Sequence, residues 1–335
     1  MTALSTDRAR ALIERFDAVT VLVLGDVMID HFLVGRVDRI SPEAPVPIVR
    51  FDHDDYRIGG AANVANNVGA LGGRATLVGV VGQDEASERL MTALRAASID
   101  STGIAAVASR PTTRKLRIVT ARNQQVARVD FESDRELDEG ERQALRPRLA
   151  ASARAADVIV VSDYLKGVVT REVMSDALAI GRDRQIPVLV DPKIPHLEYY
   201  AGCSLLTPND HEAAVATHRT TRTDDETRIA AAALRSRVGC ESVLITRGEH
   251  GMWLLDGSNK QAPPEEAILP AVAREVSDVT GAGDTVIATI ALGLAAGATL
   301  AESAMLANQA AGLAVARFGP ATVSAQELLD ACADK

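Results

Sequence analysis

Aromatic residues, cysteines and long apolar runs are all scarce in this chain of 335 residues. No apolar run reaches the roughly 18 residues that a membrane-spanning helix requires. The first 17 residues mix charged and apolar side chains, unlike a signal peptide, so we expect no membrane partner. The three cysteines, Cys203, Cys240 and Cys332, lack the spacing of a metal site, which predicts reduced thiols in a cytoplasmic protein.

Positive charge is also in deficit, because the formal net charge is −9. This balance argues against nucleic acid as a partner. Between Asp100 and Asp130, however, there is no acidic residue, and the basic residues there are Arg110, Arg114, Lys115, Arg117, Arg122 and Arg128. Such a run is either an ordinary solvated face or a site that attracts a phosphorylated ligand, and both interpretations stay open.

Apolar runs rich in Val and Ile alternate with segments of helical period, which is typical of an α/β protein. Buried strands are expected at 19–25, 75–82, 158–163, 187–191, 205–208 and 242–246. Helices are expected at 61–71, 85–97, 139–156, 171–184 and 224–238. We predict a mostly parallel central sheet with helices on both faces, and a ligand crevice beyond the carboxyl ends of its strands.

Two stretches, 46–56 and 115–129, lack a helical period and are predicted to be β ribbons, the second a hairpin around Asn123 and Gln124. We expect them to build a small lid over the crevice, formed by about 31–58 and 108–131. No Pro-, Gly- or Ser-rich linker divides the chain, so one domain over 1–335 with an inserted lid is predicted.

A glycine-rich turn at 277–285 is the most informative segment. Gly281, Ala282 and Gly283 carry little or no side chain, and the apolar run behind them predicts a helix whose first N–H groups can seat a phosphate. Asp284 would repel that phosphate unless it removes a proton from the attacking hydroxyl, so the segment indicates phosphoryl transfer. The alternative is a helix N-terminus with Asp284 as an ordinary cap.

Other polar residues stand where strands end or helices begin. Asn63, after the glycine pair 59–60, can present its amide to hydroxyls, and Asp30 suits acceptance from neighbouring sugar hydroxyls. Lys193 follows an expected strand and can reach a phosphate. Each of them also has an ordinary interpretation as a filler, cap or loop residue.

The segments 209–212 and 246–251 suggest a nucleotide end of the crevice. Glu212 can hold hydrated Mg²⁺, or it can complete a capping box with Asn209. Segment 246–251 is either a hairpin turn or a loop under a nucleotide. No P-loop and no dinucleotide-binding glycine motif follows the first strand, which disfavours P-loop enzymes and dehydrogenases.

Together these segments resemble the ribokinase-type (PfkB) family of carbohydrate kinases over nearly the whole chain. Residues 59–73 with 79–84 resemble its first signature, and residues 278–284 resemble its second. Further segments are similar to the heptose 7-phosphate kinase branch, namely 25–30, 39–47, 113–117, 122–125, 162–167 and 191–193.

The resemblance implies a ribokinase-like fold and an ATP-dependent kinase that phosphorylates the anomeric 1-hydroxyl of D-glycero-D-manno-heptose 7-phosphate, for nucleotide-activated heptose. It implies ATP and Mg²⁺ as cofactors, allows a monovalent cation such as K⁺, and implies a homodimer through the lid. Some relatives carry a nucleotidyltransferase domain after the kinase. No H-x-G-H segment follows here, so a separate nucleotidyltransferase is expected to act downstream.

The resemblance also assigns roles by position. Asp284 is the expected catalytic base, with Gly281, Ala282 and Gly283 as the anion hole. The residues expected at the substrate are Asp30, Gly59, Gly60, Asn63, Lys115, Arg117, Arg128, Asp163 and Lys193. Those expected at the nucleotide are Asn209, Glu212, Thr246, Gly248, Gly251 and Asn308, with Glu212 also at the metal. Two alternatives are another sugar kinase of the family, ribokinase- or fructokinase-like, and a non-catalytic sugar-phosphate sensor.

Overall fold

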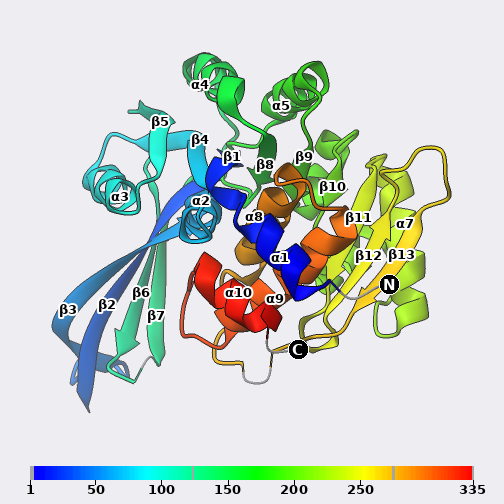
Figure 1. The fold of residues 1–335 in the computed structure, drawn as a ribbon. Helices are drawn as coiled ribbons and strands as arrows, with labels where there is room; N and C mark the ends of the chain where they lie inside the picture. The colour runs from blue at the N-terminus through cyan, green and yellow to red at the C-terminus, as the bar shows by residue number, and fades with distance from the viewer. Residues whose placement is uncertain (1–3, 123, 274–275, 334–335) are drawn as a thin grey trace.

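A large β-sheet forms the centre of the computed structural model, which describes residues 4–122, 124–273 and 276–333 (Figure 1). Its strands in spatial order are β13 (Glu265–Leu269), β12 (Met252–Asp256), β11 (Ser242–Thr246), β10 (Leu205–Leu206), β9 (Val188–Asp191), β8 (Val158–Ser162), β1 (Thr20–Gly25), β4 (Arg74–Gly82) and β5 (Asp100–Val107). Among these described strands, all neighbours from β5 to β11 pair in parallel. Strand β12 pairs antiparallel with both β11 and β13. The prediction of a mostly parallel sheet is confirmed.

Helices cover both faces of this sheet, because its strands are apolar on both sides. Val21 and Val23 of β1 pack into one buried cluster, while Leu22 and Leu24 pack into the other. The helices that share the first cluster are α1 (Thr6–Ile13), α2 (Ala61–Ala70), α3 (Glu85–Ala96), α8 (Ala282–Ala295), α9 (Leu300–Val315) and α10 (Ala325–Ala333). Those on the opposite face are α4 (Glu139–Ser152), α5 (Arg171–Arg184), α6 (Asp210–Thr217) and α7 (Asp224–Val238).

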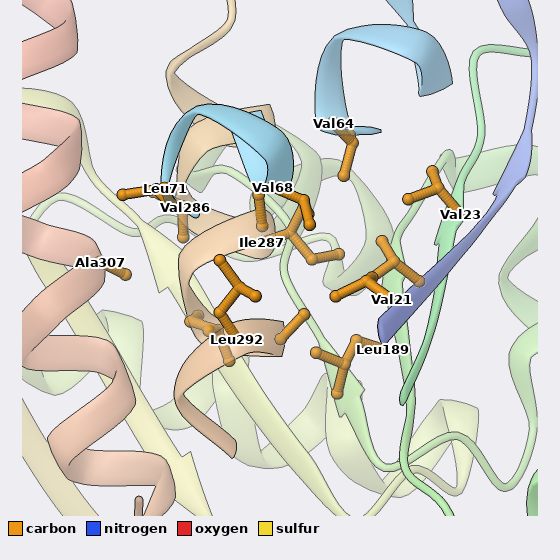
Figure 2. Packing of buried hydrophobic residues seen from close by; sticks show 14 of the residues in the cluster. Val21, Val23, Val64, Val68, Leu71, Leu189, Val286, Ile287, Leu292 and Ala307 are labelled. Atoms are coloured by element: carbon orange, nitrogen blue, oxygen red, sulfur yellow. The ribbon is translucent and has the colours of Figure 1, made fainter. Parts of the chain in front are cut away.

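Most residues of helix α8 are buried. Figure 2 shows its residues Val286, Ile287 and Leu292 packed between side chains of α2, such as Val68, and of the sheet, such as Val21. Ile287 and Leu292 have no solvent exposure. This packing fixes α8 against the sheet, with its first turn at the edge where the parallel strands end.

A second sheet, here called the lid sheet, consists of β3 (Pro47–Gly60), β2 (Val27–Ile40), β6 (Thr113–Thr120) and β7 (Gln125–Phe131). In Figure 1 it projects from the end of the large sheet that carries β4 and β5. Strand β2 pairs antiparallel with β3 and parallel with β6, while β6 and β7 form a hairpin. The two predicted ribbons are thus present. The predicted turn residue Asn123 lies outside the described residues.

Some boundaries differ from the sequence-based predictions. The helix expected at 139–156 ends at Ser152 and continues as a short 3₁₀ turn over Ala153–Ala155, and other 3₁₀ turns cover Phe16–Ala18, Ile194–Tyr200 and Gly248–His250. Strands β2, β5 and β13 were not predicted, because their apolar residues are fewer and partly exposed. Within the described ranges, no helix combines the length and apolarity needed to cross a membrane.

Candidate active site

The glycine-rich turn at the start of α8 has a backbone that only glycine adopts easily. Gly281 caps the helix with φ of 80°, in the left-handed region. A Cβ atom at this position would come within 2.9 Å of the Asn63 amide nitrogen. The turn therefore brings Asn63 of α2 against the first turn of α8, where the N–H groups have no partners inside the helix.

Asp284 lies in that first turn and is almost completely buried, with 4% of its surface exposed. Asn63 donates a hydrogen bond of 2.7 Å to one carboxylate oxygen, and the Tyr164 hydroxyl donates one of 3.0 Å to the other. Burial raises the pKa of Asp284 to about 6, although these two donors and the charge of Lys193 oppose the shift. A carboxylate accepts about four hydrogen bonds, so Asp284 keeps lone pairs for a further hydroxyl.

Asp26 ties together the elements around Asp284. Its buried carboxylate accepts hydrogen bonds from the backbone N–H groups of Tyr164, Lys166 and Val168, at 2.7, 3.0 and 3.0 Å. Its carbonyl oxygen accepts from the first N–H of α2. A side chain on Gly60, which has φ of 59°, would meet that oxygen at 2.4 Å. The loop after β8 and the start of α2 are thereby held at the same point.

One face of the lid sheet carries charged residues toward the turn of α8. Asp30 of β2 is buried and forms an ion pair with Arg117 of β6. Asp30, Phe32 and Arg117 line a cavity of about 150 Å³ together with Thr280 and Pro320. The lid sheet and the residues just before α8 therefore enclose a small cavity, and Asp284 is not among its lining residues.

The basic run of the sequence does not form one patch, because alternate strand residues face opposite sides. Lys115, Arg117 and Arg128 share the face of Asp30, as the strand register shows. Arg114 lies on the other face, with its guanidinium carbon 4.0 Å from the centre of the Phe131 ring. Arg110 is buried away from the lid, beside Glu141 at 3.8 Å.

The three cations on the cavity face differ in how far they are neutralised. Arg117 is paired with Asp30, and Arg128 forms hydrogen bonds of 2.7 and 2.5 Å with Asp130. Lys115 forms no ion pair within the described residues. Burial lowers the pKa of Lys115, so this ammonium would be stabilised by an anionic ligand.

The opposite end of the site is formed by residues after β9, β10 and β11. Lys193 forms an ion pair of 2.6 Å with Glu212. Asn209 and Glu212 make both hydrogen bonds of a capping box at the start of α6. The capping interpretation of this pair is thus confirmed, and Glu212 also joins α6 to Lys193. An isolated bridge places Asn209 beside Thr246.

Comparison with known proteins decides the family. Residues 19–327 match the model of the pfkB family carbohydrate kinases. The chain belongs to this family. It is therefore an ATP-dependent carbohydrate kinase, as the sequence predicted, and the family implies use of a divalent cation with ATP.

Relatives of this kinase include proteins named "Bifunctional protein HldE". The one from Trichlorobacter lovleyi is 45% identical over 321 residues, which cover 96% of this chain and 64% of the relative. The one from Caulobacter sp. (strain K31) is 47% identical over 326 residues, with the same two coverages of 96% and 64%. The chain thus spans slightly less than two thirds of the length of these relatives.

Solved structures confirm the ribokinase-like fold of the kinase. Phosphofructokinase-2 from Escherichia coli in complex with potassium superposes with a TM-score of 0.76 at 21% identity, covering 94% of this chain and 98% of that one. Ribokinase from Arabidopsis thaliana complexed with ribose and ATP gives a TM-score of 0.72 at 19% identity, with the same coverages. At these identities the likeness establishes the fold alone.

Several predicted residues of the kinase are brought near Asp284, and Asp163 anchors a loop beside it. Asp163 was predicted to contact substrate. Its side chain is fully buried and accepts hydrogen bonds from the Leu165 N–H, the His196 ring and the Tyr200 hydroxyl, at 2.8, 2.6 and 2.6 Å. These three hydrogen bonds hold the loop after β8, and a substrate contact of Asp163 stays a prediction.

The remaining nucleotide-end predictions lie in two places. Thr246 ends β11, and Gly248 and Gly251 flank the short turn that follows. Asn308 of α9 donates a hydrogen bond of 2.8 Å to the Pro270 carbonyl, so its amide is already engaged. A nucleotide contact for these residues stays a prediction.

Sequence reasoning missed Tyr164 and Asp191. Tyr164 contacts Asp284 across 120 residues of chain, and no local pattern announces such a contact. Asp191 ends β9, and burial raises its pKa to about 8, with Lys193 acting in the opposite direction. The available signals were their position at or just after the end of a strand of the parallel sheet, and their place in the segments 162–167 and 191–193 that resemble the heptose branch.

Proposed function

We propose that this kinase transfers the γ-phosphoryl group of ATP to the anomeric 1-hydroxyl of D-glycero-D-manno-heptose 7-phosphate, giving the 1,7-bisphosphate. The observation that carries the phosphoryl transfer is the buried Asp284, with lone pairs left free, in the first turn of α8. The choice of sugar is supported by the resemblance of segments such as 113–117 and 162–167 to the heptose branch, and by relatives named HldE at 45–47% identity.

In the proposed mechanism Asp284 accepts the proton of the sugar hydroxyl as its oxygen bonds to the γ-phosphorus. The bond from that phosphorus to the β–γ bridging oxygen breaks, and ADP leaves. Backbone N–H groups at Gly281 and Gly283 orient the γ-phosphoryl oxygens and stabilise their charge, whereas the N–H of Ala282, also predicted for this role, already donates to the Val279 carbonyl at 3.2 Å. Asn63, whose amide oxygen is buried and has no hydrogen-bond partner within the described residues, would accept from a second sugar hydroxyl.

The donor set at the nucleotide end fits Mg²⁺ held mainly through water. Both carboxylate oxygens of Glu212 already have a protein partner, and no cluster of three metal-ligand side chains occurs among the described residues. Mg²⁺ usually keeps several waters and takes only one or two carboxylates, so Glu212 with Asn209 would hold such an ion beside the ATP phosphates. The ion would neutralise charge on those phosphates. K⁺ as a further activator is part of the same proposal.

A substrate phosphate would bind to the cavity face of the lid sheet. Lys115 is the strongest candidate for this contact, because Arg117 and Arg128 are each paired with a carboxylate. Lys115→Met should therefore reduce kcat/KM for the sugar phosphate more than for the matching sugar without phosphate. Arg128→Met is the matched control and should change this ratio less. Equal losses on both sugars in Lys115→Met would contradict the assignment.

The transfer itself is tested with Asp284→Asn and a panel of sugars, with ADP release as the readout. A positioned base contributes about 10²–10⁴-fold, so kcat should fall by that factor while ATP affinity changes little. Turnover close to that of the native protein would refute the role of Asp284. Preference for ribose or fructose phosphate would favour the ribokinase- or fructokinase-like alternative, and binding without turnover would favour a sensor.

We further propose that the kinase is a cytoplasmic homodimer joined through the lid sheet, and that a nucleotidyltransferase uses its product. The outer lid face supports the dimer, because Phe131 and Val129 are 40% and 43% exposed there. Equilibrium sedimentation of Phe131→Glu tests it. A monomeric native protein, or a variant that associates as the native protein does, would argue against this interface.

A further inference from the structure

Tyr164 sits on a loop that is fixed by two buried carboxylates. Asp26, at the end of β1, accepts three hydrogen bonds from the backbone N–H groups of this loop. Asp163, after β8, accepts one from the N–H of Leu165. Leu165 itself has φ of 56°, a conformation that is unfavourable for a residue with a side chain. Such strain persists only where the surroundings over-determine it, so the backbone next to Tyr164 is held in one conformation.

This backbone aims the Tyr164 hydroxyl at Asp284, to which it donates a hydrogen bond of 3.0 Å. The ammonium groups of Lys115 and Lys193 both lie 5.7 Å from the centre of the Tyr164 ring. Burial and neighbouring carboxylates raise the pKa of Tyr164 well above its usual value, so the phenol stays protonated and acts only as a donor. It cannot replace Asp284 as the base.

The groups around Asp284 act on its proton in opposite directions. Burial and the carboxylate of Asp30, from the lid sheet, favour the protonated form. Donors from Asn63 of α2 and from Tyr164, together with the charge of Lys193 after β9, favour the ionised form. Farther out, Lys115 lies beside the Tyr164 ring. The carboxylates of Asp191 and Glu212 lie close to Lys193.

We propose that Tyr164 is a positioning residue that keeps Asp284 ionised and its carboxylate in a fixed orientation for proton removal. The inference rests on the proposed role of Asp284 as the base. The hydrogen bond from the phenol stabilises the carboxylate more than the carboxylic acid, because a hydrogen bond to a charged acceptor is stronger than one to a neutral carbonyl oxygen. The phenol uses one of about four acceptor sites on the carboxylate, so it does not block the sugar hydroxyl.

Tyr164→Phe tests the proposal, because it removes the hydroxyl and keeps the ring. Loss of a donor to the charged form should raise the pKa of Asp284 by about one pH unit, a tenfold change in proton affinity. In a plot of kcat/KM against pH, the acid limb should shift to higher pH by that amount, while the rate on the alkaline plateau changes less. Tyr199→Phe is the control, since Tyr199 contacts Glu136 at 3.3 Å and lies outside the site. Its acid limb should coincide with that of the native protein.

A second readout does not depend on turnover. The carboxyl carbon of Asp284 is followed by NMR in protein labelled with ¹³C-aspartate, and its signal is assigned by its loss in Asp284→Asn. An upward shift of the Asp284 titration midpoint in Tyr164→Phe, and none in Tyr199→Phe, supports the inference even if the sugar substrate has been misassigned. An unchanged midpoint overturns it, and so does an equal shift in both variants. Loss of the kinase proposal would instead appear as full activity of Asp284→Asn.

Discussion

Replacement of Gly281 by alanine should damage both the fold and the site. Gly281 has φ of 80°, and a Cβ there would lie 2.9 Å from the Asn63 amide nitrogen. The methyl group cannot be accommodated unless Asn63 moves, and Asn63 donates to Asp284 at 2.7 Å. The substitution therefore strains the backbone and disturbs a hydrogen bond to the carboxylate of Asp284, the proposed base.

The expected size of this effect follows from its parts. A left-handed conformation costs a residue with a side chain about 1–2 kcal/mol. Loss of a hydrogen bond to a charged group costs about 1.5–3 kcal/mol, and the stiffer unfolded chain returns about 0.4–1 kcal/mol. We expect Gly281→Ala to lower the free energy of unfolding by about 2–4 kcal/mol.

Gly283→Ala is the matched control two residues further along the same turn. A Cβ at Gly283 meets nothing within 4 Å, and Gly283 is not among the glycines with positive φ. Alanine is preferred to glycine in a helix by about 0.5–1 kcal/mol, so this variant should be as stable as the native protein or slightly more so. If the turn seats the γ-phosphoryl group, its methyl group should still raise KM for ATP.

Urea unfolding monitored by Trp253, the single tryptophan of the chain, measures both variants. Equal unfolding free energies for Gly281→Ala and Gly283→Ala would refute the argument from backbone conformation. A normal KM for ATP in Gly283→Ala would refute the argument that phosphate lies against this turn.

Three further outcomes are expected. Asp284→Asn should raise the free energy of unfolding at pH 7 by up to about 3 kcal/mol. Burial raises the pKa of Asp284 to about 6, so ionisation of this side chain costs the native fold stability as the pH rises from about 4 to about 6. Urea unfolding at pH 4 and pH 7 checks this, and the stability gained by the variant should vanish at pH 4. Ile287→Ala should cost about 2–5 kcal/mol, since Ile287 is fully buried, whereas Ile229→Ala, at a residue 42% exposed, should cost far less. Lys193→Met should raise KM for ATP, because it removes the ion-pair partner of Glu212. It should also shift the acid limb of the kcat/KM profile to higher pH, because it removes a positive charge that lowers the pKa of Asp284. An unshifted pH profile would show that Lys193 acts on the nucleotide alone.

Local patterns in the sequence were sufficient for the first turn of α8. Gly281 and Asp284 are three residues apart in the chain, and the rest of the helix after Asp284 is unbroken and largely apolar. The strands around β1 were also predictable, because both faces of a central parallel strand are buried and nearly every residue is apolar.

Contacts between distant segments were not predictable in this way. The sequence alone leaves the basic run as either a solvated face or a phosphate site, whereas in the structure strand register places Lys115 and Arg114 on opposite faces and Arg110 is buried beside Glu141. The family resemblance assigns Asp163 to the substrate, and only the packed structure reveals the three donors that surround it. Tyr164 was missed because its partner comes from another helix.

Three carboxylates face a site that must accept anionic substrates, and each is compensated in a different way. Asp30 is paired with the guanidinium of Arg117. Asp191 has a pKa of about 8, so at neutral pH it is mainly protonated and adds little negative charge. Asp284, with a pKa of about 6, is mainly ionised at the same pH and keeps its charge through Asn63, Tyr164 and Lys193. Of these three carboxylates, Asp284 alone stays mainly ionised without a salt-bridge partner, and it stands at a helix N-terminus, where the dipole favours an anion and where we propose that a proton is removed.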